Sequence, residues 1–340
     1  MNVFSPKERL LRVLKGDKVE RPPVICPGGM MNAAIVEVMD KTGHTLPEAH
    51  HDEKLMSELS YDVSSNTGFE NFGIPFCMTV EAEVLGSEIN FGTYSCEPKI
   101  QKELYGSVSQ VNYEDTGVLL KSGRINTIIQ AGYRLSKKHP DIPLLGNLTG
   151  PISTAASIVD PIPFLKELRK DPENAHRVID YVSDFLIEYA RLMVDNGAAA
   201  ISIGDPTATG EILGPKIFEE YVLRYINKVA DGIHQAGVPA IVHICGNMNT
   251  VRHLIHKINA DAISTDALVN LRHLKEDYPE IRTMGNLSTY LLEFGTPDKV
   301  ELQTQRLVSD GIDIISPACG LSTSSSLDNI NTMTRTVKEN

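Results

Sequence analysis

The stretch from residue 198 to residue 245 decides the fold. It reads Ala-Ala-Ala-Ile-Ser-Ile-Gly-Asp at 198–205 and, after a long segment, Pro-Ala-Ile-Val-His-Ile-Cys at 239–245. Each apolar run has the length of a buried strand and ends in a polar or thiol side chain. Between them, apolar residues fall at i, i+3, i+4, i+7 and i+11 and predict a helix over 216–236: Phe218, Tyr221, Val222, Tyr225 and Val229. This strand–helix–strand unit predicts two parallel strands.

The same alternation extends outward in both directions along the chain. Eight segments have the composition of strands: 22–26, 62–66, 143–148, 198–205, 239–245, 261–266, 282–286 and 312–319. Eight parallel strands with helical connections indicate a closed barrel rather than an open doubly wound sheet. The sequence therefore predicts an α/β fold, a single (β/α)8 TIM barrel.

The interval between the second and third of these strands is unusually long. Residues 78–84 and 88–91 have the pattern of an added hairpin, and a helix is expected around 115–138. Nothing in the chain resembles a linker of low complexity. We therefore expect one barrel domain over 1–340, with a hairpin and helix excursion around 74–138.

Composition and charge exclude several classes of protein. The chain has 340 residues, 41% of them hydrophobic, which is too many for a disordered protein. Thirty-two Lys and Arg against 44 Asp and Glu give a net charge of −12, which argues against a nucleic-acid or anionic-membrane partner. No run approaches the roughly 18 to 20 apolar residues of a membrane span. The charged, amphipathic start at 1–16 lacks the apolar core of a signal peptide. A cytoplasmic protein is expected.

The cysteines point to a metal site. There are five, an odd number spread far apart, so a disulfide framework is not expected. His243 and Cys245 are two residues apart on a predicted strand, so their side chains share one side of it. Imidazole and thiolate are ligands of zinc, and Cys319 at the end of the last strand is the natural third ligand. The competing interpretation is a packed core histidine with two buried thiols.

Other polar residues close predicted strands at the same barrel mouth. Three interpretations are open for Asp266: a fourth metal ligand, a hydrogen-bond acceptor for one of the ligating side chains, or a carboxylate that faces solvent. Substrate binding is the hypothesis for Asp205, Asn147 and Asn286; for Asp205, capping the next helix is an equally good interpretation. Two further pairs have competing interpretations. Glu81 and Glu83 lie on a solvated hairpin face or reach the site, with the solvated face favoured, and the pair at 30–31 are core methionines or form an apolar lip.

At this point the sequence resembles a known family. It is similar to the uroporphyrinogen decarboxylase-like superfamily and, within it, to the corrinoid-dependent methylcobamide:coenzyme M methyltransferases. The stretches that carry the resemblance lie along nearly the whole chain: 5–11, 47–52, 81–83, 145–151, 205–209, 243–247, 285–287 and 316–320. The resemblance implies a (β/α)8 barrel with a catalytic zinc held by His243, Cys245 and Cys319.

The resemblance also implies a reaction and a partner. A zinc ion with two thiolates and an imidazole lowers the pKa of an incoming thiol, such as coenzyme M, which would take a methyl group from a methylated corrinoid protein. Tetrahydrofolate and homocysteine are alternative acceptors, and a non-catalytic corrinoid-binding barrel is the alternative of another class. Porphyrinogen decarboxylation is disfavoured, because the segment at 26–32 has none of the arginines with which those enzymes hold propionates.

Overall fold

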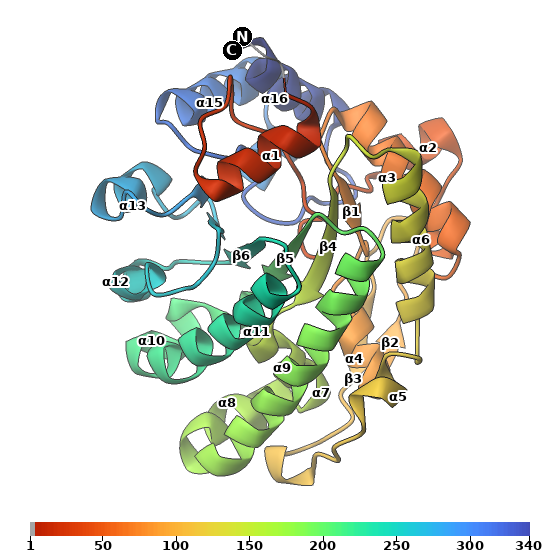
Figure 1. The fold of residues 1–340 in the computed structure, drawn as a ribbon, viewed down its shortest axis with the longest axis vertical. Coiled ribbons are helices and arrows are strands. Elements are labelled where there is room, and N and C mark those ends of the chain that lie inside the picture. Colours follow the sequence, from red (N-terminus) through yellow and green to blue (C-terminus); the bar gives the residue numbers. More distant parts are fainter. Residues whose placement is uncertain (1–3) are drawn as a thin grey trace.

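Six parallel strands form the central sheet of the computed structural model, which describes residues 4–340 (Figure 1). The strands are neighbours in the order β1-β4-β5-β6-β7-β8. Their bounds are Phe72–Ile74 for β1, Leu144–Thr149 for β4, Ala200–Gly204 for β5, Ala240–Ile244 for β6, Ala262–Thr265 for β7 and Thr283–Met284 for β8. Strands β4 to β7 are buried along their whole length, as expected for strands covered by helices on one side and facing a packed interior on the other.

Single bridges close this sheet into a barrel. Val24 pairs with Ile315, and Ile314 pairs with Met284, all in parallel. The segments at 22–26 and 312–319 therefore occupy the remaining two of eight strand positions, and the predicted (β/α)8 barrel is confirmed. They are not regular strands, because Pro22, Pro23 and Pro317 lack the backbone N–H that a ladder requires.

The predicted second strand at 62–66 is wrong. These residues lie in helix α3 (Glu53–Thr67), which begins where the Asp52 carboxylate accepts hydrogen bonds from two backbone N–H groups and ends at Gly68 in the left-handed conformation. The true strand at this position is β1, whose three residues are too few to show an alternating pattern.

Helices surround the barrel, and α6, α9 and α11 flank the sheet in Figure 1. The helix predicted over 216–236 is confirmed as the end of α10, a π-helical segment at Phe218–Leu223 and α11. The helices are α1 (Pro6–Lys15), α2 (Val36–Thr42), α3, α4 (Val80–Val84), α5 (Thr116–Leu119), α6 (Ile125–Lys138), α7 (Pro151–Ile158), α8 (Pro161–Lys170), α9 (Pro172–Asp195), α10 (Gly210–Ile217), α11 (Arg224–Gln235), α12 (Arg252–Ile255), α13 (Leu271–Asp277), α14 (Thr289–Phe294), α15 (Pro297–Ser309) and α16 (Leu327–Glu339).

The excursion between β1 and β4 is only partly as expected. Its hairpin is antiparallel and consists of β2 (Glu88–Asn90) and β3 (Lys99–Lys102). The segment at 78–84, predicted as the first hairpin strand, instead contains the short helix α4, and the helix expected at 115–138 is divided into α5 and α6. Glu81 and Glu83 thus lie on a helix and do not share the face of a strand.

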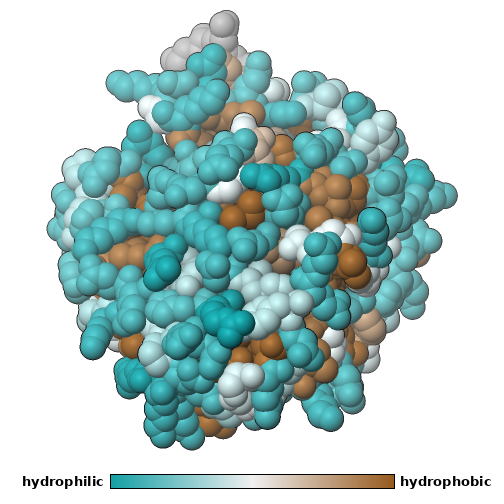
Figure 2. Space-filling model, turned by 60° about the horizontal axis from the view of Figure 1, so that its bottom comes forward, coloured by the Kyte–Doolittle hydropathy of each residue, from teal (hydrophilic) through white to brown (hydrophobic). Residues whose placement is uncertain are grey.

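The carboxyl ends of the strands point away from α1 and α16. Helices α7 and α10, which follow β4 and β5, lie in the half of the molecule away from α1 and α16 (Figure 1). Figure 2 turns this end toward the viewer, and hydrophilic residues cover most of it, with apolar residues in separate patches. Within residues 4–340, no helix combines the length and the apolar character needed to cross a bilayer.

Candidate metal centre

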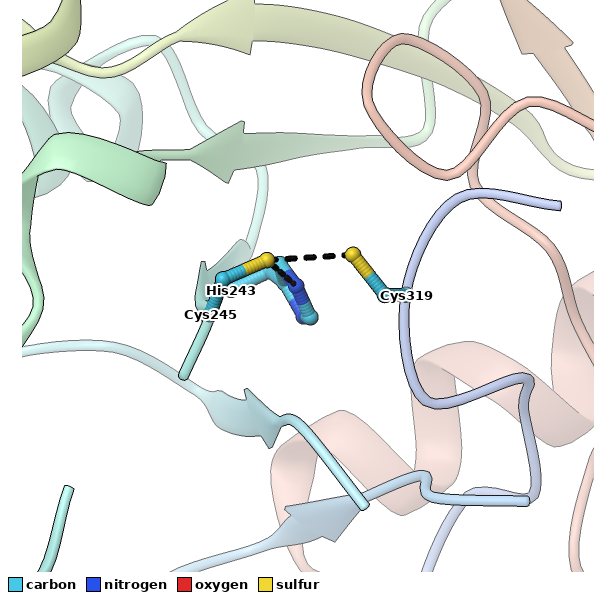
Figure 3. Close-up of side chains that lie close together, drawn as sticks. All are labelled: His243, Cys245 and Cys319. Atoms are coloured by element: carbon cyan, nitrogen blue, oxygen red, sulfur yellow. Dashed lines mark hydrogen bonds between the residues drawn. The ribbon is translucent and has the colours of Figure 1, made fainter. Parts of the chain in front are cut away.

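Three side chains from two distant parts of the sequence meet at the barrel mouth. His243 lies on β6, Cys245 directly follows this strand, and Cys319 is the final residue of the barrel segment at 312–319. The His243 Nε2 atom is 3.2 Å from Cys245 Sγ, which is 3.0 Å from Cys319 Sγ. One donor atom from each residue lies within 4.8 Å of the others, and Figure 3 shows them pointing toward one another. They are the set that the sequence predicts as metal ligands.

Local backbone structure accounts for this convergence. Strand β6 is paired on both sides, and His243 stands opposite Gly204 of β5 and Ser264 of β7. The chain turns sharply after Cys245, where Gly246 has φ of +75°. On the other side, the N–H of Ala318 donates to the carbonyl of Leu287 at 2.8 Å and fixes the loop that carries Cys319.

Ser264 orients the imidazole, and sequence analysis did not find it. Its Oγ lies 2.8 Å from Nδ1 of His243, and both side chains are buried. This contact leaves Nε2 directed toward the two thiols, which is the orientation that a metal ligand needs. The only signal for Ser264 is its position opposite His243 in the sheet, which becomes visible once the strand register is known.

The two thiols are electrostatically unequal. A hydrogen bond from Cys245, opposed by burial and supported by His243, lowers the pKa of Cys319 to about 5. The same hydrogen bond and burial raise the pKa of Cys245. Cys319 is therefore the first of the pair to become a thiolate, ready to bind a cation.

The donor set suits zinc. One imidazole nitrogen and two thiol sulfurs are typical zinc ligands, and three protein ligands leave a fourth position for a substrate. The buried Ser264 contact further fits a coordinated histidine, because such residues usually bind a second group through the other ring nitrogen.

A tight turn presents a methionine to this centre. Gly28 and Met31 exchange backbone hydrogen bonds of 3.1 and 2.8 Å, which places Met30 at the tip of the turn. The Met30 Sδ atom is 3.9 Å from Cys245 Sγ. Met31 is buried and its sulfur lies 4.0 Å from Ser264 Oγ, so this residue belongs to the core around the site.

Asp266 and Asn286 lie near the end of β7 but outside the donor group. The Asp266 carboxylate accepts a hydrogen bond of 3.0 Å from the N–H of Leu268, a local turn contact. The Asn286 amide donates to the carbonyls of Asp266 and Val269 at 2.8 Å each. Asn286 thus fixes the loop after β7, and its role in substrate binding stays a prediction, as does that of Asp266 toward a metal.

Asp205 and Asn147 are also engaged with the backbone. The Asp205 carboxylate accepts hydrogen bonds from the N–H groups of Ile152 and Ser153, so it caps α7 and not the helix that follows it in sequence. Burial raises the pKa of Asp205 to about 6. The Asn147 amide donates to the carbonyls of Pro27, Ile74 and Leu145. That either residue binds substrate remains a prediction.

A buried polar cluster takes the place of the solvated face expected for Glu81 and Glu83. Glu81 is only 1% exposed and accepts hydrogen bonds from the N–H and hydroxyl of Thr149. Burial raises the pKa of Glu81 to about 7. The guanidinium of Arg124 binds Glu83 at 2.6 Å and also donates to Thr79. The expectation fails because a strand was assumed where the chain forms α4.

Comparison with known proteins finds relatives that match this chain over nearly its whole length. The chain is similar to methylcobamide:CoM methyltransferase MtbA of Methanosarcina acetivorans, with 33% identity over 323 residues and 94% of each chain covered. It is 29% identical over 339 residues to methylcobamide:CoM methyltransferase MtaA of Methanosarcina barkeri, covering 97% of this chain and 96% of the relative.

Solved structures extend the likeness to three dimensions. A methyltransferase from Methanosarcina mazei superposes with a TM-score of 0.92 at 29% identity, covering 99% of both chains. A B12-independent methionine synthase from Shewanella shares the fold alone, with a TM-score of 0.57 at 13% identity over 94% of this chain and 98% of that one. The sequence model for uroporphyrinogen decarboxylase (URO-D) matches residues 5–340. The chain therefore belongs to the uroporphyrinogen decarboxylase (URO-D) family.

Proposed function

We propose that this protein is a methyltransferase that moves a methyl group from a methylcobamide, carried by a corrinoid protein, to a thiol such as coenzyme M. The observation that carries the proposal is the convergence of His243, Cys245 and Cys319 within 4.8 Å at the barrel mouth. The relatives named for methyl transfer from methylcobamide to CoM support the same reaction, because they match this chain over nearly its whole length.

The three converging side chains would hold zinc. When bound there, zinc would lower the pKa of an acceptor thiol in its open position, so that the thiolate exists at neutral pH. His243 contributes a neutral nitrogen and Cys245 and Cys319 contribute two negative sulfurs, so the charge of the donors balances that of the ion. Ser264 keeps the imidazole in place through its 2.8 Å contact.

The transfer itself exchanges one bond for another. The acceptor sulfur forms the new S–CH3 bond, while the Co–CH3 bond breaks and leaves its electron pair on cobalt, which passes from Co(III) to Co(I). The thiol proton goes to solvent. The residues of this chain position the acceptor at the mouth, where a corrinoid protein can present the methyl group from outside.

The segment after the first barrel position supports this reaction over decarboxylation of a porphyrinogen. Residues 26–32 form the turn beside the thiols and contain no arginine. A substrate with several carboxylates would lack counter-ions there, whereas a small thiol requires only the donor set.

The test is a methyl-transfer assay with a choice of acceptors. Methylcobalamin is supplied with coenzyme M, homocysteine or tetrahydrofolate in turn, and Co(I) or Co(II) formation is followed by absorbance. Zinc is measured in the same preparations. We expect about one zinc per chain and demethylation with a thiol, fastest with coenzyme M.

Cysteine variants provide the control. Cys245→Ala and Cys319→Ala should lose zinc and activity, whereas Cys96→Ala should keep both, because Cys96 is exposed and lies outside the donor group. If the wild-type protein holds no zinc and the two cysteine variants demethylate methylcobalamin as fast as wild type, the proposal is wrong. Activity with tetrahydrofolate alone would mean that tetrahydrofolate, and not a thiol, is the acceptor.

A further inference from the structure

The turn at residues 28–31 brings a third sulfur atom to the candidate metal centre. Met30 Sδ lies 3.9 Å from Cys245 Sγ. Two sulfur ligands of one tetrahedral zinc, each bound at about 2.3 Å, are separated by about 3.8 Å. The thioether and this thiol thus already have the separation of two ligands of a single ion.

The position of Met30 is fixed by close contacts with glycine backbones. A Cβ on Gly204, at the end of β5, would be 3.1 Å from Cβ and 3.3 Å from Sδ of Met30, and a Cβ on Gly320 would be 2.4 Å from its carbonyl oxygen. Gly204 pairs with His243, and Gly320 follows Cys319. Met30 is therefore packed against the strand neighbour of His243 on one side and against the chain neighbour of Cys319 on the other.

The turn could not come so close with larger residues. Gly28 and Gly29 have φ of +105° and +55°, and a Cβ on either would lie 2.7 Å from the side chain of Asn147. The N–H of Gly29 donates to the carbonyl of Pro75 at 2.7 Å. The backbone of the turn is thus tied to the barrel, while the Met30 side chain at its tip is only half-buried. The side chain can move without the turn.

We propose that Met30 is the fourth, exchangeable sulfur donor of the metal site, and that its thioether holds the position of the acceptor sulfur until the acceptor binds. The proposal rests on the proposed function in taking that acceptor to be a thiol. A thioether is uncharged and a weaker donor than a thiolate, so an acceptor thiolate displaces it. The acceptor proton passes to solvent, and no electrons are transferred.

The same exchange explains how product leaves. The methylated acceptor is itself an uncharged thioether, and Met30 is a donor of the same type. Because Met30 is tethered to the site, it replaces the product without a diffusional search. Asp266, the alternative fourth ligand, is held by Leu268 in its own turn.

The test uses X-ray absorption at the zinc edge on acceptor-free protein whose methionines are replaced by selenomethionine. We expect one selenium atom in the first shell of zinc, and its loss when coenzyme M is added. Met30→Leu, which has a similar size and no sulfur, should lack the selenium and bind coenzyme M more tightly. Met31→Leu is the matched control and should keep the selenium.

The outcomes separate this proposal from the proposed function. If no selenium is bound to zinc in the acceptor-free protein that is otherwise native, the role of Met30 is overturned. If the spectrum instead shows an oxygen ligand that is lost in Asp266→Asn, the fourth position belongs to Asp266. The measurement needs no turnover. If selenium is bound to zinc but the protein transfers methyl groups to none of the acceptors, Met30 is a zinc ligand and the proposed methyltransferase function is wrong.

Discussion

The hydroxyl of Ser264 on β7 lies 2.8 Å from Nδ1 of His243 on β6, and the two residues are direct neighbours in the sheet. This contact orients the imidazole before any ion binds. Removing it should let the ring rotate and should lower the basicity of Nε2. We therefore expect Ser264→Ala to bind zinc about 10- to 100-fold more weakly than wild type. Competition with a chromophoric chelator measures this affinity.

Thr265→Val is the matched control for Ser264→Ala. Thr265 is the next residue on β7 and is buried, and its hydroxyl has no hydrogen-bond partner among the described residues. Its replacement should leave zinc affinity unchanged. Equal affinities of Ser264→Ala and wild type would show that Ser264 does not support the ligand.

Glu81 should make stability depend on pH. Burial raises its pKa from 4.5 to about 7 in the folded protein. Between these values the folded state keeps a proton that the unfolded state has lost, so the free energy of unfolding falls as pH rises. Glu81→Gln is permanently neutral and should escape this loss, which is on the order of 2 kcal/mol. Urea unfolding of both proteins from pH 5 to pH 8 measures the difference.

The control for Glu81→Gln is Glu88→Gln, since Glu88 is an exposed residue of β2. Its pH profile should run parallel to that of wild type. A Glu81→Gln profile that also stays parallel would mean that Glu81 is not protonated in the folded state at neutral pH.

Gly320 is expected to tolerate no side chain. A Cβ at this position would lie 2.4 Å from the carbonyl oxygen of Met30, well inside van der Waals contact. Gly320→Ala should push the turn at 28–31 away from Cys319 and weaken zinc binding by about 10-fold or more, as loss of a supporting contact does. Isothermal titration with zinc tests this. Gly106→Ala, where the nearest atom is a side-chain oxygen at 3.4 Å, should bind zinc as wild type does.

Arg124 should be important for stability. It binds Glu83 at 2.6 Å and its guanidinium carbon lies 5.0 Å from the ring centre of Phe91, while its side chain is only 3% exposed. Arg124→Met leaves Glu83 without its cation and should cost about 3 kcal/mol in the free energy of unfolding. The comparison is Arg134→Met, whose pair with Glu53 is largely exposed and should cost at most ~1 kcal/mol. Similar losses in the two variants would contradict a special role for Arg124.

Long buried strands and short polar motifs were predictable from sequence. Strands β4 to β7 were found because each is a mostly apolar run of strand length that is followed by or ends in small or polar residues. His243 and Cys245 were found because strand geometry puts alternate residues on one side. Cys319 required only the rule that the carboxyl ends of barrel strands meet at one mouth.

Features that depend on contacts between segments were not predictable. Strand β1 has three residues, so no periodicity marks it, and the stretch at 62–66, which belongs to α3, was predicted as a strand in its place. Ser264 acts through its register with His243, and Met30 acts through a turn shaped by glycines in three segments. No local pattern carries either kind of information.

The closure of the barrel by single bridges has a thermodynamic consequence. Met30 lies just after the first, and Cys319 at the end of the second, of the two segments that meet at Val24 and Ile315, whereas His243 and Cys245 lie at the end of β6 in the regular sheet. An ion held by both groups would connect the segments that close the barrel through single bridges to the regular part of the sheet. Metal binding and closure of the barrel would then be linked equilibria. Chelation should then speed hydrogen exchange first at the N–H groups of Ile25 and Ile315, which bond between the two closing segments. In this protein the ion that activates the acceptor would also stabilise the closed barrel.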